Sequence, residues 1–334
     1  MLRMPRFEVH LPRTGSEAVA LRASLPQSTY VAGGTDLLPN LKHGLAGPKH
    51  LISLSHVAEF GGIAIEEDGT LRLGAGTSLQ TIADSDRVRS FLPALASAAG
   101  SVAGPQHRRM GTLGGNVMLD TRCLFYNQTE LWREALGYCL KREGDFCHVI
   151  GSEARCVAAQ SADTVPVLIA AGAIVEFATP DGRAEIDLGS LYNKDGRHEL
   201  VFNLSEEALV TAVRIPPQRQ EHRSLYRKVR ARGSVDFPQL GLALVSAFDG
   251  PSVEHLTAVV SAVLPRPIVL RGLDAAHGTE LEDEVIDKLG ELTYKQVTPQ
   301  TSIHGLPDWR RQRARVEMRR GLEELRRDAT AATL

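Results

Sequence analysis

Four cysteines are the residues of this chain whose type and spacing most clearly indicate chemistry. The 334-residue sequence holds no others, and they follow one another with the spacing C-x15-C-x7-C-x8-C, at Cys123, Cys139, Cys147 and Cys156. Four thiolates are the number that an iron–sulfur cluster needs, and structural zinc also takes four. Zinc sites usually contain close C-x2–4-C pairs, which the chain lacks. The spacing therefore favours a cluster, with zinc and unligated or disulfide-bonded cysteines as the alternatives.

Two glycine turns could hold a phosphate group. Gly33-Gly34 lies between an expected strand and an expected helix, and Gly114-Gly115 follows Thr112, whose hydroxyl could donate to a phosphate. Glycine permits positive φ and close approach, and successive N–H groups in such turns bind anions. Neither turn is the G-x-G-x-x-G of a Rossmann unit. Two such turns on separate elements predict a dinucleotide clasped at its pyrophosphate, although a glycine pair is more often only a turn. Asp36 is better suited to capping a helix or binding a sugar hydroxyl.

The elements that must position these residues alternate between strand and helix at first. Capping, hairpin and periodicity signals then predict two hairpins, a helical stretch from Leu79 to Ala99 and three long strands near the C-terminus. The expected strands cover residues 7–11, 28–32, 51–54, 63–65, 71–73, 174–177, 184–187, 225–229, 240–248 and 256–263; the other expected helices cover 14–25, 37–43, 165–171 and 309–326. The Pro216-Pro217 pair and the polar run to Arg223 indicate a domain boundary.

The two glycine motifs carry a resemblance to a known family. Ala32-Gly33-Gly34-Thr35-Asp36-Leu37 and Gly111-Thr112-Leu113-Gly114-Gly115-Asn116 resemble the paired FAD motifs of the medium, flavin-carrying subunits of the xanthine dehydrogenase (molybdenum hydroxylase) family, and Ser161 to Pro166 resembles a third element. The likeness continues in Lys228-Val229-Arg230 and Asp236-Phe237-Pro238. It implies no catalytic residue on this subunit and FAD contacts at Val31, Ala32, Gly33, Gly34, Thr35, Asp36, Val102, Thr112, Gly114, Gly115, Asn116, Asp163 and Lys228.

The resemblance also implies the fold and the domain limits. The expected class is α+β, with a two-part FAD-binding domain of the vanillyl-alcohol-oxidase (PCMH) type at residues 1–220, split near residue 56. A smaller α+β domain of the CO dehydrogenase flavoprotein C-terminal type is expected at 223–327. An inserted iron–sulfur loop at 119–158 carries every cysteine, whereas most medium subunits of the family pass almost directly from the second glycine motif to the third.

The inserted loop resembles the beta subunits of 4-hydroxybenzoyl-CoA reductases. The cysteine spacing carries the likeness together with Asp120 to Cys123 and Phe125 to Gln128. The resemblance implies that Cys123, Cys139, Cys147 and Cys156 ligate a [4Fe–4S] cluster. Arg122, Lys141 and Arg155 lie near cysteines in the sequence and can offset cluster charge, or are ordinary surface residues, and His148 is an alternative ligand.

The function implied is electron transfer within an oxidoreductase complex. A ferredoxin-like donor would supply electrons through [4Fe–4S] and FAD to a small [2Fe–2S] subunit and a large molybdenum-cofactor subunit, which would dehydroxylate 4-hydroxybenzoyl-CoA to benzoyl-CoA in aromatic degradation. A dimer of heterotrimers is expected. One alternative is the FAD subunit of an oxidising hydroxylase of the xanthine, aldehyde or CO dehydrogenase kind. The other is a scaffold subunit stabilised by zinc.

Composition and charge exclude other classes of protein. The net charge of −2 gives no reason to expect a nucleic-acid partner or an anionic membrane. No apolar stretch approaches the roughly 20 residues that span a bilayer, and the first ten residues are not those of a secretory signal. A cytoplasmic location is therefore expected.

Overall fold

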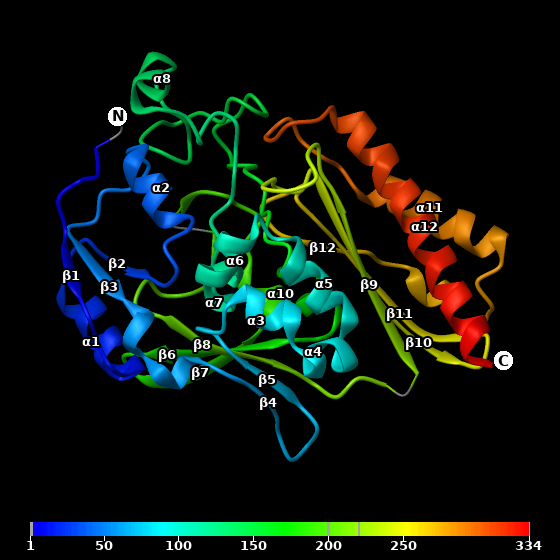
Figure 1. Ribbon diagram of the computed structural model, residues 1–334. Coiled ribbons are helices and arrows are strands. Elements are labelled where there is room, and N and C mark those ends of the chain that lie inside the picture. The colour runs from blue at the N-terminus through cyan, green and yellow to red at the C-terminus, as the bar shows by residue number, and fades with distance from the viewer. Residues whose placement is uncertain (1–2, 199–200, 220, 334) are drawn as a thin grey trace.

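The computed structural model describes residues 3–198, 201–219 and 221–333. Within these ranges the chain forms three separate sheets, with helices between and outside them (Figure 1). The predicted α+β class is confirmed by this mixture. The expected limits of the first domain, residues 1 and 220, lie outside the described residues. No helix within the described ranges has both the length and the apolar character needed to cross a membrane.

The N-terminal unit is a small parallel sheet with the order β1-β3-β2. Its strands and connecting helices are β1 (Glu8–His10), α1 (Gly15–Ser24), β2 (Ser28–Val31), α2 (Leu37–Lys42) and β3 (His50–Ser53). Parallel neighbours need crossover connections, and α1 and α2 supply them. The first glycine turn lies at the end of β2, where the chain enters α2.

The central unit is an antiparallel sheet with the order β4-β5-β8-β6-β7. Its strands are β4 (Ile63–Ile65), β5 (Leu71–Gly74), β6 (Ile174–Thr179), β7 (Gly182–Asp187) and β8 (Leu209–Ile215). Both predicted hairpins are present, whereas β8, which pairs with β5 and β6, was missed by the sequence interpretation. Two 3-10 helices, η1 (Leu54–His56) and η2 (Ala58–Phe60), lead from β3 into this sheet. The sheet then pairs strands that are far apart in the sequence, because β5 and β8 are neighbours.

Helices cover the central sheet and supply about half of the buried residues of its core. They are α3 (Leu79–Asp84), α4 (Asp86–Phe91), α5 (Pro93–Ser101), α6 (Pro105–Met110), α7 (Leu113–Val117), α9 (Thr164–Ala170) and α10 (Leu188–Leu191). The helices predicted from Leu79 to Ala99 are present as α3, α4 and α5, and the last of them extends to Ser101. Ser85 caps α4 by accepting the Val88 N–H at 3.3 Å, and Pro93 begins α5, where its missing N–H costs nothing.

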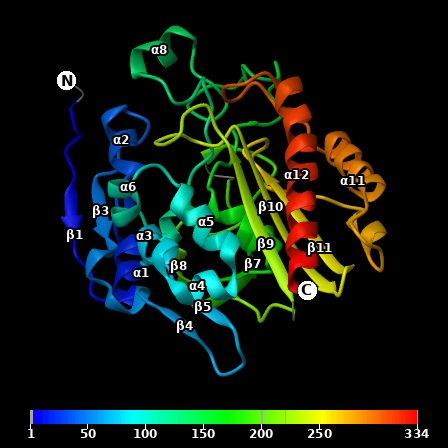
Figure 2. The ribbon, with the colours of Figure 1, turned by 45° about the vertical axis from the view of Figure 1, so that its right-hand side comes forward.

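The C-terminal unit is an antiparallel sheet with the order β12-β11-β10-β9, covered on its outer face by two helices (Figure 2). The elements are β9 (His222–Val229), β10 (Leu240–Asp249), β11 (Ser252–Ser261), β12 (Ile268–Val269), η4 (Leu273–Ala276), α11 (Asp283–Gln296) and α12 (Pro307–Thr333). β10 is buried along nearly its whole length because α12 packs on one side of the sheet and α9 on the other. The sequence interpretation missed α11 and found α12.

The cysteine segment joins α7 to α9 and contains one short helix, α8 (Glu130–Ala135). Thr129 caps α8 by accepting the Trp132 N–H at 3.4 Å. The rest of the segment is turns and isolated bridges, and it protrudes beside α2 at the top of the view in Figure 1.

Candidate functional site

The first glycine turn allows close contact with another backbone segment and leaves two backbone N–H groups without an acceptor among the described residues. Gly34 has φ +69°, and a Cβ at Gly33 would lie 1.9 Å from the carbonyl oxygen of Met110, which no side chain could tolerate. The two glycine motifs therefore touch through their backbones. Within the described part of the chain, the N–H groups of Gly34 and Thr35 have no hydrogen-bond acceptor. Free N–H groups in such a turn suit a phosphate oxygen.

The second glycine turn uses its N–H groups within the protein. The Gly114 N–H donates to the Ala75 carbonyl at 2.8 Å, and the Gly115 N–H donates to the Thr112 hydroxyl at 3.1 Å. A Cβ at Gly114 would meet the Cβ of Ala75 at 2.8 Å. Gly114 is thus needed for packing α7 against the residue that follows β5, while the Thr112 hydroxyl proton remains available.

Two further predicted residues, Asp163 and Lys228, share one buried side-chain network. Lys228 Nζ donates to Asp163 Oδ2 at 2.7 Å and to the Ser101 carbonyl at 3.0 Å, beside Val102 at the end of α5. Burial raises the pKa of Asp163, against the effects of Lys228 and the Tyr226 hydroxyl, which donates to Oδ1 at 2.7 Å. These contacts join α5, α9 and β9. A contact of Asp163 or Lys228 with the flavin stays a prediction.

Asn116 links the second motif to the third. Its Oδ1 accepts the Thr164 hydroxyl at 2.6 Å. Because Asn116 is buried, this bond fixes α7 against the start of α9. Val31 is the last residue of β2 and Ala32 the next residue, so both lie directly before the first turn.

Asp36 does not cap α2, so that part of its expected role is wrong. Its carboxylate instead forms an ion pair with Arg122 and accepts from Asn40 Nδ2 at 3.0 Å. The Arg122 guanidinium carbon lies 3.7 Å from the centre of the Phe237 ring. Arg122 therefore connects the first glycine turn, the residue before Cys123 and the loop before β10. No sequence signal marked this three-way contact.

The four cysteines surround one small cavity. All are buried and reduced, and the other residues that line the cavity are Phe125, Tyr126, Leu140, Lys141, His148, Val149 and Ala158. Burial raises the pKa of Cys123 to about 11 and that of Cys156 to about 12. Buried thiols of this kind stay protonated unless a cation compensates the thiolate charge.

The sulfur positions bear on the zinc alternative. Among the described residues, no three cysteine sulfurs lie within 4.8 Å of one another. A single tetrahedral zinc with bonds of about 2.3 Å would need its sulfurs about 4 Å apart. A cluster spreads its thiolates further, because each binds a different iron. The sulfur atoms therefore do not have the spacing of a single tetrahedral zinc site, and the cluster stays a prediction. His148 lines the same cavity, and its Nε2 is bonded to the Tyr138 carbonyl at 2.5 Å. A second bond of this kind is common for ligating histidines, so the role of His148 as an alternative ligand stays a prediction.

Two buried cations hold the segment in shape. Lys141 Nζ donates to Asp120 Oδ1 at 2.7 Å, to the Thr121 hydroxyl at 2.9 Å and to the Gly196 carbonyl at 2.7 Å. Arg133, almost fully buried, donates to the Gln128 and Gly44 carbonyls and pairs with Glu130. Lys141 was noted in the sequence for its position near cysteines and Asp120 as part of the resemblance, whereas the ion pair between them was missed because they are far apart along the chain.

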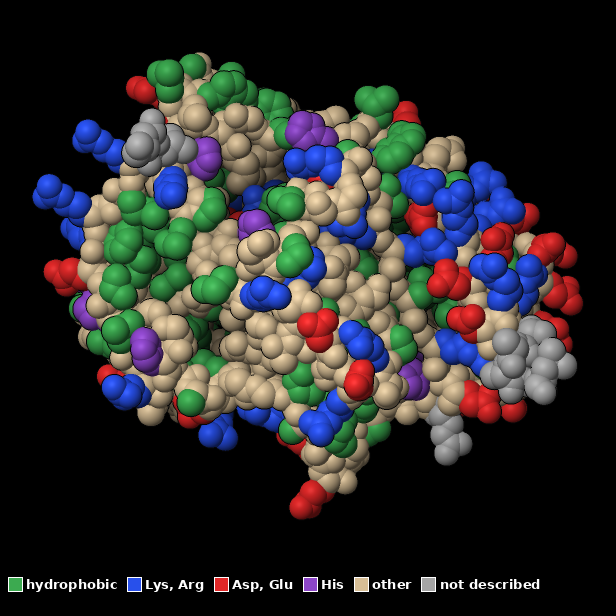
Figure 3. Space-filling model, in the orientation of Figure 1, with side chains coloured by type: hydrophobic (Ala, Val, Ile, Leu, Met, Phe, Trp, Pro, Cys, Tyr) green, Lys and Arg blue, Asp and Glu red, His purple; other side chains and the backbone are tan. Residues whose placement is uncertain are grey.

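Apolar side chains cover the exposed tip of the segment. Leu131, Trp132, Leu136 and Phe146 are all exposed, and apolar atoms gather over α8 at the top of Figure 3. Inside the tip, the Phe125 ring stacks on His148 with centroids 5.4 Å apart. These side chains give the tip of the segment an apolar outer surface.

The chain is similar to known proteins along nearly its whole length. Residues 5–218 match the family described as the FAD binding domain in molybdopterin dehydrogenase, and residues 224–325 match the CO dehydrogenase flavoprotein C-terminal domain. The xanthine dehydrogenase FAD-binding subunit of Escherichia coli O157:H7 is 26% identical over 90% of this chain and 89% of its own length. The aldehyde oxidoreductase FAD-binding subunit of Escherichia coli K12 is 30% identical over 74% of this chain and 79% of its own.

A solved structure shows the same arrangement of elements. A chain of carbon monoxide dehydrogenase from Hydrogenophaga pseudoflava superimposes with a TM-score of 0.77 at 25% identity, covering 95% of this chain and 96% of that one. These likenesses confirm the predicted combination of a PCMH-type domain with a flavoprotein C-terminal domain.

Proposed function

Because the chain belongs to the FAD-binding subunit family of xanthine dehydrogenase and CO dehydrogenase-type molybdenum hydroxylases, we propose that it is an electron-transfer subunit that holds a [4Fe–4S] cluster as well as FAD. The observation that carries the proposal is the gathering of four buried, reduced cysteines around one cavity. Cys123, Cys139, Cys147 and Cys156 are the proposed ligands.

The residues present fit both groups. Gly33, Gly34 and Thr35 would receive the FAD pyrophosphate at the free N–H groups of the first turn, and Thr112 has a hydroxyl proton to donate. When bound, a cluster would exchange single electrons and a flavin one or two, so the pair would join a one-electron donor to a two-electron reaction elsewhere. The chain's own task is to exclude water from the thiols and to fix the segment that carries them, through Lys141 and Arg133.

A more specific proposal concerns the direction of electron transfer and the partner proteins of this chain. We propose that electrons enter at the cysteine segment from a ferredoxin-like donor and leave toward a small [2Fe–2S] subunit and a large molybdenum subunit, as in a reductive dehydroxylation of 4-hydroxybenzoyl-CoA. The exposed apolar tip around Trp132 gives a donor protein a surface next to the cysteines. The proposed assembly is a dimer of heterotrimers, and the proposed location is the cytoplasm.

A second function is favoured by the relatives. Xanthine dehydrogenase, aldehyde oxidoreductase and CO dehydrogenase subunits are similar to this chain over most of its length. An oxidising hydroxylase would take electrons from its substrate and release them outward through this subunit. Such a function explains the two domains and the glycine turns, and it gives the four cysteines no necessary role.

Metal analysis tests the cluster. Protein purified without oxygen should contain about four iron atoms and four acid-labile sulfides per chain and give the EPR signal of a reduced cluster after dithionite. Cys139→Ser should lose the signal, whereas Leu131→Ala, an exposed change in the same segment, should keep it. Zinc without sulfide would contradict the cluster and support the scaffold alternative.

The direction of transfer needs a separate measurement on the assembled complex. Reduced ferredoxin should bleach the FAD absorbance of the normal complex rapidly and that of the Cys139→Ser complex slowly. Equal rates in the two complexes would contradict entry through the cysteines. Rapid bleaching by a xanthine, aldehyde or CO-type substrate, with none by ferredoxin, would support the oxidising function.

A further inference from the structure

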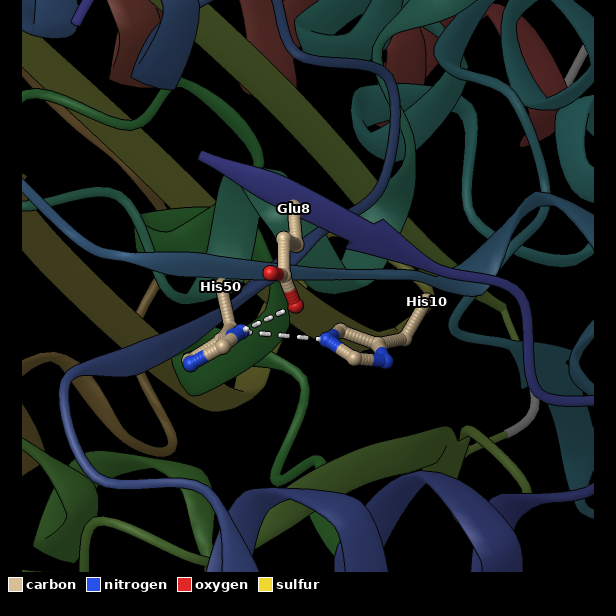
Figure 4. Close-up of side chains that lie close together, drawn as sticks. All are labelled: Glu8, His10 and His50. Carbon is tan, nitrogen blue, oxygen red and sulfur yellow. Dashed lines mark hydrogen bonds and ion pairs between the residues drawn. The ribbon is translucent and has the colours of Figure 1, made fainter. Parts of the chain in front are cut away.

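Three potential metal ligands lie close together on the N-terminal sheet, β1-β3-β2, far from the cysteines in the sequence. Glu8 and His10 alternate along β1 with one residue between them, so their side chains share a face of the strand. His50 begins β3, and in the parallel pairing of the two strands it lies opposite Glu8. The sheet register therefore brings together two residues from one strand and one from its neighbour. Figure 4 shows the three side chains pointing toward one another.

The distances match the spacing of ligands around a small tetrahedral ion. His10 Nε2 lies 3.2 Å from His50 Nδ1, and Glu8 Oε2 lies 3.4 Å from the same Nδ1. The three ligand atoms all fall within 4.8 Å of one another. Zinc bonds of about 2.0–2.1 Å in a tetrahedron place neighbouring ligand atoms about 3.3 Å apart. Two of the three separations thus already have the required length, and the Glu8 side chain, 75% exposed, is free to adjust the third.

We propose that Glu8, His10 and His50 form a site for a divalent transition-metal ion, with Zn²⁺ as the first candidate. Imidazole nitrogens favour zinc and its neighbours, whereas Mg²⁺ and Ca²⁺ prefer oxygen ligands alone. Three protein ligands leave the fourth position for water or for a group from another molecule. The donor set contains no sulfur, which separates this site chemically from the cysteine segment.

A bound ion would fasten an edge strand to the sheet. β1 has three residues and pairs only with β3 within the described part of the chain. The ion would join Glu8 and His10 to a residue about 40 positions later. A ligand that binds only the folded form stabilises that form in proportion to its occupancy. The same sheet carries β2, which leads into the first glycine turn, so the ion would stabilise the unit that presents Gly33 and Gly34.

Cobalt binding tests the proposal directly. Full-length chain without an affinity tag, purified anaerobically, is titrated with Co²⁺ and followed by its visible spectrum. We expect one Co²⁺ per chain with the d–d bands of nitrogen and oxygen ligands and no sulfur charge-transfer band. His10→Gln should weaken this binding about tenfold or more. His56→Gln is the matched control, because His56 lies in η1 of the same unit, and its ring nitrogen binds Ser55 rather than this group.

A second variant and a second measurement keep the test decisive. Glu8→Gln changes an exposed side chain and should also weaken Co²⁺ binding without unfolding the strand. Zn²⁺ should raise the melting temperature of the normal chain and of His56→Gln, and it should do so less in His10→Gln and Glu8→Gln. Equal Co²⁺ affinity and equal thermal shifts in all four proteins, or a spectrum of sulfur ligands alone, would overturn the site. In that case the two histidines would form only the 3.2 Å hydrogen bond.

Discussion

The central sheet with its helices and the cysteine segment are held together by different forces. The core of the central unit is apolar, with Leu71, Leu73 and Leu95 fully buried. The cysteine segment shares a small core with Leu45, in which two of the five buried members are thiols, and its other anchors are Lys141 and Arg133. Burial of apolar surface stabilises the first region without help from a cofactor. The second depends on charged groups bonded to carbonyls and, under the proposed function, on what the thiols bind.

Removing a proposed cluster ligand should affect the two regions most differently. In Cys147→Ser we expect iron and sulfide to be lost and protease cleavage between residues 119 and 158 to rise about tenfold or more, because metal binding and folding of such segments are coupled. The rest of the chain should remain a resistant core. Limited proteolysis with mass spectrometry measures both. Unchanged cleavage in the segment would mean that its protein contacts alone keep it ordered.

Removing the buried ammonium group should have the next largest effect. Lys141→Met keeps most of the side-chain length but removes the ammonium donor from Asp120 and the Gly196 carbonyl, which keep weaker, neutral donors from Thr121. Breaking a buried ion pair in this way costs about 3–5 kcal/mol of stability. We expect a cost toward the lower end of this range because Asp120 remains partly accessible to water. Hydrogen exchange should quicken in residues 119–158 and hardly change in β10. Lys194→Met, an exposed lysine nearby, serves as the control.

A cavity in the central core should destabilise the central unit and leave the cysteine segment intact. Leu71→Ala removes a fully buried side chain and should lower the free energy of unfolding by about 2–5 kcal/mol. Iron content should stay normal in the folded protein. Denaturant unfolding followed by circular dichroism gives the change, and Ile65→Ala on the exposed face of β4 should cost far less. Loss of iron in folded Leu71→Ala would show that the regions are not independent.

The sequence predicted the central and C-terminal sheets better than the cysteine segment, for physical reasons. Alternation along β6 and the turn at Asp181-Gly182 report local preferences, so that hairpin could be recognised. β8 was missed because its partners lie far away in the sequence, and the three-helix division after Leu79 depends on single capping residues. The clustering of the cysteines was visible, whereas Asp120, Phe237 and Gly196 act only through long-range contacts. Asp36 looked like a cap and instead binds Arg122, which only the folded arrangement reveals.

Acid should weaken the cysteine segment before it affects the apolar core. Burial alone would raise the pKa of Asp120, but Lys141 and His198 outweigh it and lower the pKa to about 2. A depressed carboxyl pKa contributes stability that is present above the ordinary value near 4 and is lost as pH falls toward 2. The contribution is on the order of 2 kcal/mol. Fluorescence of Trp132, in α8, should therefore change between pH 4 and pH 2 in the normal chain.

The pH effect of Asp120 is isolated by a variant that cannot titrate. Asp120→Asn should be less stable at neutral pH and should show a smaller change between pH 4 and pH 2, measured by hydrogen exchange of residues 119–158 at each pH. Acid also attacks clusters, so the two proteins are compared after cluster removal. A transition of equal size in both would assign the acid sensitivity to other groups.

Substitution of Arg122 should have the smallest effect, and it tests most directly whether the cysteine segment influences the first glycine turn. Its guanidinium pairs with Asp36 beside the first glycine turn and stacks on Phe237, which is about half exposed. A double-mutant cycle of Arg122→Ala and Phe237→Ala should give a coupling energy of about 0.5–1 kcal/mol in the free energy of unfolding. FAD affinity should also fall in Arg122→Ala, because Asp36 loses its partner, and should fall less in Phe237→Ala. Unchanged FAD affinity in Arg122→Ala would mean that the glycine turn is set by β2 and the Met110 backbone alone, and that the cysteine segment is attached to the flavin site without influencing it.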